Sequence, residues 1–298
     1  MKHLKSIFFA FILISLATSC KKEKLDSKSV FTDTQIEQND LDKYIYKNLT
    51  QPYNIQILYK YVDRESDLNY HLVPAPYEGS VRMTKLLIYL GLEPYDKVTG
   101  SKQFIRSYFP KLLNYIGTVA VRNNGTVVLG TAESGTKITM YNLINLNATN
   151  GNSPSFLNTY YFKTIHHEFQ HILNQTKPFP SNFREITGTK YVDDAWNTVY
   201  TTTGAAVADG FVSPYASKSG EEDFAELFSF YVTRSQADFD AILNSTGSTA
   251  AGRTIVNTKL NVVKNYMKGE WAIDMDVLRQ EMLTRFANLS SFDQTTLN

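Results

Sequence analysis

The sequence has a single cysteine, Cys20, so the folded chain cannot form an internal disulfide. Its formal net charge is only +1 and its body has no run of basic residues, which argues against nucleic-acid binding. After residue 20, no apolar stretch is long enough to span a bilayer. Two glycine-bearing segments, 125–130 and 200–204, lack the Lys-Ser/Thr ending of a phosphate-binding loop, so we expect turns there.

Histidine is also scarce, with five in the chain, yet three of the five lie within residues 166–171. This segment contains H-E-x-x-H. On a helix, residues four apart share a face, so the imidazoles of His167 and His171 can bind one Zn²⁺. Glu168 is placed to accept a proton from an attacking water, whereas His166 faces elsewhere. The alternative interpretation is a surface helix with incidental histidines, and we leave His71 out of the site.

The residues around this motif predict a helix. Ser153 is an N-cap candidate and Pro154 suits the first helical position. Apolar residues then recur at helical spacing as far as Leu173, on a different face from His167, Glu168 and His171. Pro178 is expected to end the helix.

Two imidazoles leave a catalytic zinc site one protein ligand short. Asn174 and Lys177 stand where a longer motif would have glycine and a third histidine, so we expect a carboxylate. Glu222 and Glu226 share a face of a second predicted helix, where one can bind the metal and the other can accept a hydrogen bond from a ligating imidazole.

Two alternatives for the third ligand remain open. Ser219 and Glu222 also fit a capping box, in which Glu222 only reaches back to the start of its own helix. Asp193 and Asp194 are the other carboxylates considered. Because a third histidine is missing, we assign Glu222 as the ligand and Glu226 as the partner of an imidazole.

H-E-F-x-H followed about fifty residues later by E-x-F-A-E resembles the gluzincin branch of zinc metallopeptidases. The whole chain is similar to the zinc-binding metallopeptidase lipoproteins of Bacteroidetes, described as substrate-import-associated zinc metallohydrolases that occur beside TonB-dependent importers. The shared blocks are residues 51–55, 166–175, 213–216 and 222–226.

The resemblance implies two further features. Tyr215, seven residues before Glu222, matches a tyrosine whose hydroxyl helps to stabilise the oxyanion. Taken alone, a tyrosine beside a proline in a chain with 19 tyrosines is commonly a packing residue. Such enzymes also bind extended peptide along the strand before the metal helix, which here implies an edge within residues 118–146.

The N-terminus is typical of a secretory leader. Lys2 and Lys5 precede an apolar core over 7–16, and residues 16–20 (LATSC) resemble a bacterial lipobox. We expect a signal peptide over 1–19, acylation of Cys20, a polar tether over 20–33 and one catalytic domain over 34–298. An incidental thiol is the alternative for Cys20. The lipid anchor would hold the protein at the outer membrane, with the domain facing outward.

Hydrophobic periodicity and turn signals predict an α+β fold of the zincin type, with a small mixed sheet before the metal helix and a mainly helical C-terminal part. Asn123-Asn124-Gly125 predicts a hairpin between strands over 118–122 and 126–131. Other strands are expected near 54–62 and 136–146. Helices are expected near 35–48 (opened by Thr34-x-x-Glu37), 79–93, 101–115, 235–244, 251–268 and 273–289.

These expectations combine into a zinc hydrolase acting as a peptidase on peptide or protein substrates, with one Zn²⁺ held by His167, His171 and Glu222. Glu168 would be the general base, Tyr215 the oxyanion donor and Glu226 a residue that orients a ligand. By the resemblance, it would process peptides or glycoproteins beside a TonB-dependent importer. The alternative is a non-catalytic binding lipoprotein of an uptake complex, with a structural or vestigial zinc site.

Overall fold

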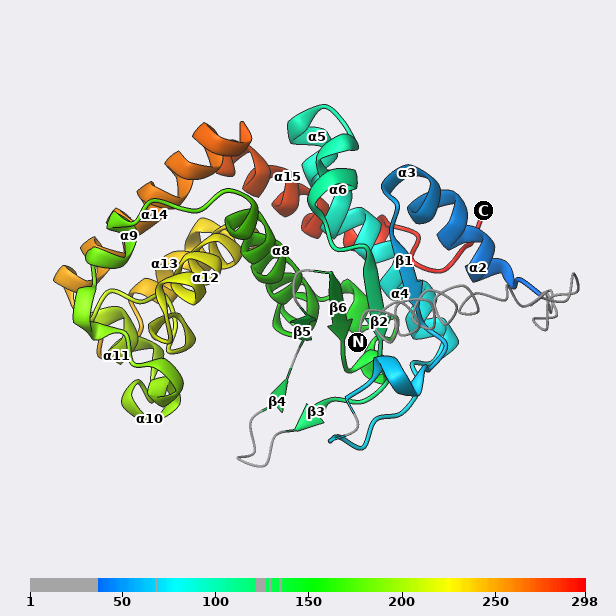
Figure 1. Ribbon diagram of the computed structural model, residues 1–298, viewed down its shortest axis with the longest axis horizontal. Helices are drawn as coiled ribbons and strands as arrows, with labels where there is room; N and C mark the ends of the chain where they lie inside the picture. The colour runs from blue at the N-terminus through cyan, green and yellow to red at the C-terminus, as the bar shows by residue number, and fades with distance from the viewer. Residues whose placement is uncertain (1–36, 68, 122–126, 129, 134–135) are drawn as a thin grey trace, which may run out of the picture. The chain divides into compact units, whose positions relative to one another are not determined.

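A computed structural model describes residues 37–67, 69–121, 127–128, 130–133 and 136–298 (Figure 1). The predicted signal peptide, Cys20 and tether lie outside the described residues. Within the described ranges, no helix is long and apolar enough to cross a membrane. Residues 39–298 form one unit of mixed α+β structure, as predicted, with helices predominating.

The first helix begins later than the sequence predicted. Helix α2 (Asp40–Ile45) continues through a π-helical turn (Tyr46–Thr50) into α3 (Gln51–Tyr53). The predicted cap at Thr34 lies outside the described residues, and the observed cap is Asn39. Its Oδ1 accepts a hydrogen bond from the Asp42 amide at 2.9 Å, while its own amide donates to the Asp42 carboxylate at 3.1 Å. This reciprocal capping box fixes the start of the helix at Asp40.

The next helices lie between the first two strands of the sheet in sequence. The helix predicted near 79–93 is longer than expected, with α4 (Tyr77–Leu86), a π-helical turn (Leu87–Leu92) and α5 (Glu93–Thr99) in succession. The helix predicted over 101–115 is wrong in its second half. Helix α6 (Gln103–Tyr108) stops before Pro110, which disfavours helical backbone at Phe109, and residues 112–115 form a strand instead.

A four-stranded sheet has the order β1-β2-β6-β5. β1 pairs with β2 and β2 with β6 in parallel, while β5 runs antiparallel to β6 at the edge. The residues of β6 are all buried, as expected for an interior strand, so the strand that precedes the metal helix is not the edge strand. The strands are β1 (Gln56–Leu58), β2 (Leu112–Tyr115), β5 (Gly130–Glu133) and β6 (Lys137–Met140).

The strands predicted at 54–62 and 136–146 are shorter than expected. Asn54 adopts a left-handed conformation (φ 57°) at the end of α3, and Asn142 (φ 71°) ends the extended segment after β6. The predicted hairpin is confirmed in its described part, since β3 (Ala120–Val121) pairs antiparallel with β4 (Val127–Val128). Its Asn-Asn-Gly turn lies outside the described residues.

The helix that carries H-E-x-x-H begins as predicted. Ser153 caps α7 (Pro154–Leu157) by accepting a hydrogen bond from the amide of Phe156 at 3.2 Å. The helix continues through a π-helical turn (Asn158–Phe162) into α8 (Lys163–Thr176) and ends two residues before Pro178. α8 packs against the edge strand β5 on one side and against α12 (Gly220–Thr233) on another (Figure 1).

After α8 the described chain is helical, as predicted. α12 also packs against α14 and α15, so the second candidate helix lies at the centre of the C-terminal part (Figure 1). The remaining helices are α9 (Asn182–Glu185), α10 (Trp196–Val199), α11 (Thr203–Ala208), α13 (Gln236–Leu243), α14 (Ala250–Trp271) and α15 (Met275–Ala287).

Candidate metal centre

Helices α8 and α12 bring three predicted ligands together. The Nε2 atoms of His167 and His171, one helical turn apart, lie 3.0 Å from each other. Oε2 of Glu222, on α12, lies 3.0 Å from the first and 3.1 Å from the second. Within the described residues, this is the one group of three or more His, Cys, Asp or Glu side chains whose ligand atoms converge closely enough for a metal ion.

The donor set fits zinc. Two imidazole nitrogens and a carboxylate oxygen are common zinc ligands, and ligands about 2.1 Å from a tetrahedral ion lie about 3.4 Å apart. The three atoms here are at nearly that separation. Two neutral imidazoles with their Nε2 lone pairs turned toward each other and toward a carboxylate repel one another unless a cation lies among them. Burial disfavours the protonated imidazole of His167, but its contacts with the Glu222 and Glu226 carboxylates favour it more strongly. The pKa of His167 is therefore raised.

Glu226 contacts the far side of the His167 ring, as predicted. Nδ1 of His167 lies 2.9 Å from Oε1 of Glu226, which is buried at 1% exposure. Burial by itself disfavours the charged carboxylate, but Lys163 and His167 together lower the pKa of Glu226 to about 2. An ionised Glu226 favours the proton of His167 on Nδ1, which leaves the Nε2 lone pair available for a metal.

Two residues that the sequence analysis missed hold Glu226 in place. Ser213 donates a hydrogen bond to Oε2 at 2.6 Å, and Lys163 forms an ion pair with Oε1. The position of Lys163 near the site could have been predicted, because it lies four residues before His167 and therefore on the same helix face. Ser213 belongs to the block 213–216 that had been singled out for Tyr215 alone.

Glu168 lies beside the three ligands without joining them. Its side chain is partly buried, and this burial raises its pKa, while the imidazoles of His167 and His171 act in the opposite direction. A carboxylate with a raised pKa next to a metal centre is suited to accept and return a proton. Its role as the general base stays a prediction.

Tyr215 also lies in the site. Its hydroxyl donates a hydrogen bond to Oε1 of Glu222 at 2.9 Å, the oxygen that does not face the imidazoles. Burial and the nearby Glu222 raise its pKa, so the phenol stays protonated and remains a donor. Trp196 packs edge-on against the Tyr215 ring, with the ring centroids 5.2 Å apart.

A family described as "Putative zinc-binding metallo-peptidase" matches residues 34–276. The chain belongs to this family. It is similar to a putative zinc-binding metallo-peptidase from Bacteroides caccae ATCC 43185, known from a crystal structure at 2.10 Å resolution. The two chains are 32% identical with a TM-score of 0.75, and the match covers 91% of this chain and 100% of the other. None of the curated proteins matches the chain.

The geometry also shows where the carboxylates left open by the sequence lie. Ser219 does cap α12, accepting a hydrogen bond from the Glu222 amide at 3.4 Å, but the Glu222 carboxylate reaches the imidazoles instead of completing the capping box. Asp193 and Asp194 lie outside the cluster. The Asp194 side chain is 93% exposed and pairs with Lys218 at 3.4 Å. Within the described residues, the carboxylate that converges with the two imidazoles is that of Glu222.

His166 faces away from the cluster, as predicted. Its Nδ1 lies 2.9 Å from the Tyr95 hydroxyl, and complete burial lowers its pKa to about 3, so the ring is neutral. The exposed His71 is not in the cluster either. Of the four histidines that the structure describes, His167 and His171 are the two that belong to the cluster.

A buried ion pair anchors α12 through a residue next to Glu222. Asp223, next to Glu222, pairs with Lys259 of α14, and both side chains are completely buried. Lys259 also donates a hydrogen bond to the Gly210 carbonyl at 3.0 Å, and Tyr191 donates one to Asp223 at 2.9 Å. These contacts hold the first turn of α12, and hence Glu222, in position. No pattern in the sequence indicates this pair.

Proposed function

We propose that this protein is a zinc-dependent peptidase of the gluzincin type, in which His167, His171 and Glu222 hold one Zn²⁺. The observation that supports this proposal most directly is the convergence of three ligand atoms, 3.0–3.1 Å apart, beside Glu168. When bound, the ion would polarise the scissile carbonyl and make water more acidic. Membership of a zinc-binding metallopeptidase family supports the hydrolase assignment.

The side chains around the ligands have different roles in the proposed reaction. Glu168 accepts the proton of the attacking water and then passes it to the leaving amine. Glu226 keeps the His167 ring oriented and its proton on Nδ1, supported by Ser213 and Lys163. A site that only stabilised the fold would have no need of a base such as Glu168.

The sheet edge supports a peptide as the substrate. β5 is the last strand of the sheet and packs against α8, which carries His167 and His171. An edge strand offers main-chain donors and acceptors on its open side, and an extended peptide can add to it as a further strand. A peptide bound along β5 would run beside the helix that carries the ligands.

A peptide-library assay tests the proposed function. We expect the purified, zinc-loaded protein to cleave members of a random peptide library, to stop when a chelator is added and to recover when zinc is restored. Mass spectrometry of the products identifies the cleaved bonds. A protein that binds zinc but cleaves no peptide in the library would instead be a binding lipoprotein with a structural metal.

We further propose that Tyr215 stabilises the oxyanion by turning its hydroxyl from Glu222 toward the substrate carbonyl. Tyr215→Phe is then expected to lower kcat about a hundredfold, because one oxyanion donor is lost. Zinc affinity should fall by no more than about tenfold, the lower end of the range for a partner of a metal ligand, because the imidazoles and the carboxylate of the donor set remain. Steady-state kinetics and zinc titration of the same preparation separate the two effects. A large loss of zinc affinity with little change in kcat would mean that Tyr215 serves Glu222 alone.

Anchoring of the enzyme as an outer-membrane lipoprotein is also our proposal. Its support is the lipobox-like sequence ending at Cys20 and the resemblance to import-associated lipoproteins, which suggests peptide or glycoprotein trimming beside a TonB-dependent importer. Cys20→Ser is expected to move the protein from the membrane fraction to the soluble fraction, since the acyl chains are lost. Fractionation after a salt wash measures this, and a variant that stays with the membrane would contradict the anchor. Protease added to intact cells tests whether the domain faces outward.

A further inference from the structure

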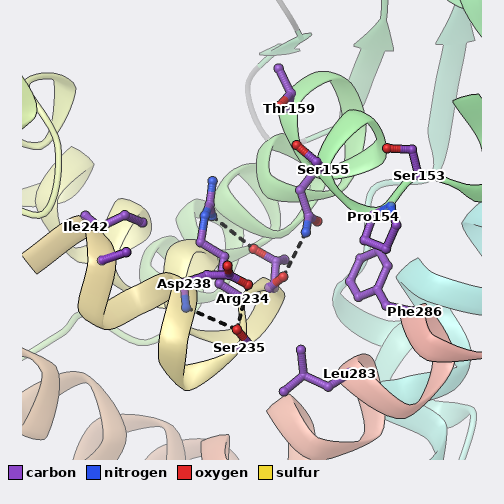
Figure 2. A pocket seen from close by; sticks show the side chains of 13 residues that line it. Ser153, Pro154, Ser155, Thr159, Arg234, Ser235, Asp238, Ile242, Leu283 and Phe286 are labelled. Carbon is purple, nitrogen blue, oxygen red and sulfur yellow. Dashed lines mark hydrogen bonds between the residues drawn. The ribbon is translucent and has the colours of Figure 1, made fainter.

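A second site lies at the far end of the helix pair that carries the metal ligands. A pocket of about 550 Å³ opens where α7 begins, α12 ends and α13 begins, with α15 along another side (Figure 2). Ser155 and Thr159 line it from the first turns of the metal helix, Arg234 lines it from the end of α12, and Asp238 lines it from the first turn of α13. Its volume is within the range of small-molecule sites.

Two facing rows of side chains connect this pocket with the metal centre. Glu222, Glu226 and Phe230 follow one another at a spacing of four on α12, and Arg234, the residue that ends this helix, continues the spacing. Lys163, four residues before His167, pairs with Glu226 and lies 5.3 Å from the centre of the Phe230 ring. The Arg234 guanidinium lies 4.0 Å from the centre of the same ring. Arg234 is about 12 Å along the helix from Glu226, so the pocket is separate from the ligand cluster.

Arg234 offers unused donors to the pocket. In the described part of the chain it forms no ion pair, and its side chain donates a hydrogen bond only to the Thr233 hydroxyl, at 3.3 Å. A guanidinium has five N–H donors in a planar fork that matches a carboxylate. A ligand carboxylate would supply the missing partner.

Asn158 adds an acceptor without a partner. Its side chain is 8% exposed, lines the pocket and donates from Nδ2 to the Thr233 carbonyl at 2.8 Å. Its Oδ1 accepts no hydrogen bond from any residue that the structure describes. A buried acceptor left unpaired is costly, so an N–H group from a ligand would satisfy it.

The other walls of the pocket define the remaining ligand chemistry. Asp238 supplies a negative charge a few residues from Arg234 and, among the described residues, forms no ion pair. Leu283 and Phe286 of α15 and Ile242 of α13 supply apolar surface (Figure 2). A positive group, a negative group and an apolar wall together match a carboxylate, an ammonium and an apolar side chain in one small molecule.

We propose that this pocket binds short zwitterionic peptides with apolar side chains, at a site distinct from the metal centre. The peptide carboxylate would pair with Arg234, its amino or amide N–H groups would reach Asp238 and Asn158, and its side chains would lie against Leu283 and Phe286. The inference goes beyond the proposed peptidase activity, since binding here needs neither metal nor turnover.

Calorimetric titration with the dipeptide Leu-Leu tests the site. We expect Leu-Leu to bind zinc-loaded protein carrying Glu168→Gln, which prevents cleavage, and to bind equally well to wild-type protein after chelation of the metal. Leu-Leu amide, which lacks the carboxylate, should bind about tenfold or more weakly. N-acetyl-Leu-Leu, which lacks the ammonium, should bind several-fold more weakly.

Variants assign the binding to the pocket. Arg234→Gln should weaken Leu-Leu binding about tenfold to a hundredfold, whereas Arg64→Gln, a change at an arginine with an 86% exposed side chain, should not alter it. Asp238 is exposed, so Asp238→Asn should fold normally and should abolish the preference for Leu-Leu over N-acetyl-Leu-Leu. The proposal is overturned if Leu-Leu does not bind, if binding disappears with the metal, or if neither Arg234→Gln nor the amide weakens it. A protein without peptidase activity that still bound Leu-Leu through Arg234 would refute only the proposed function.

Discussion

Glu168→Gln is expected to retain the metal and to lower kcat about a hundredfold to ten-thousandfold, the range for loss of a general base. Glutamine has nearly the shape of glutamate, but its amide cannot accept the proton of the attacking water. Because Glu168 is not among the three converging ligand atoms, the substitution removes proton transfer and leaves the donor set intact. The effect should therefore appear in kcat and not in zinc affinity.

The measurement combines zinc content, zinc affinity and peptide turnover for the same preparation. Glu185→Gln is a matched control, because Glu185 is an exposed glutamate on the neighbouring helix α9. It should leave kcat and zinc affinity unchanged. Substantial turnover in Glu168→Gln would mean that another group serves as the base. Loss of zinc from this variant would mean that Glu168 supports the ligands.

Local spacing accounts for the part of the site that the sequence predicted. His167 and His171 share a helix face whatever the rest of the fold does, so H-E-x-x-H alone brings them together. Glu222 could be proposed because the third histidine was missing. Its choice over Asp194 depends on how α12 packs against α8, and that contact spans about fifty residues of sequence.

The supporting residues could not be predicted in the same way. Ser213 contacts Glu226 only because the chain before α12 folds back against that helix, and no spacing rule gives this contact. The Asp223–Lys259 pair joins two helices through a completely buried contact, whereas charged residues are usually expected at the surface. Tertiary packing, and not local pattern, determines these positions.

The errors in the predicted secondary structure also arise because tertiary packing overrides the local pattern. Residues 101–115 satisfy helical periodicity, but Pro110 interrupts the helix and residues 112–115 complete the sheet between β1 and β6. The capping pattern at Thr34 and the capping box at Asn39 compete within six residues, and the described helix starts at the second. Element type was predictable where a long periodic segment had its own cap, as at Ser153.

Glu222→Ala is expected to weaken zinc binding more than about a hundredfold, since even partners of the ligands contribute tenfold to a hundredfold. The substitution removes the carboxylate oxygen that lies 3.0 and 3.1 Å from the two imidazoles and deletes a negative charge facing the cation. Contacts with His167 and His171 hold the pKa of Glu222 well below its usual range despite burial, so the group is ionised and ready to bind metal at neutral pH.

Competition with a chromogenic chelator gives the zinc affinity of Glu222→Ala. The double variant His167→Ala/His171→Ala sets the lower limit, and Asp194→Ala tests the alternative carboxylate with a side chain that is 93% exposed. We expect Asp194→Ala to bind zinc like the wild type, and the double variant to retain none at stoichiometric level. Thermal unfolding of the metal-free proteins checks that the loss is not one of fold. If Glu222→Ala kept its zinc, or if the double variant still carried one ion per chain, the ligands would lie elsewhere. The opposite signatures of Glu222→Ala, in affinity, and Glu168→Gln, in kcat, would separate the ligand from the base.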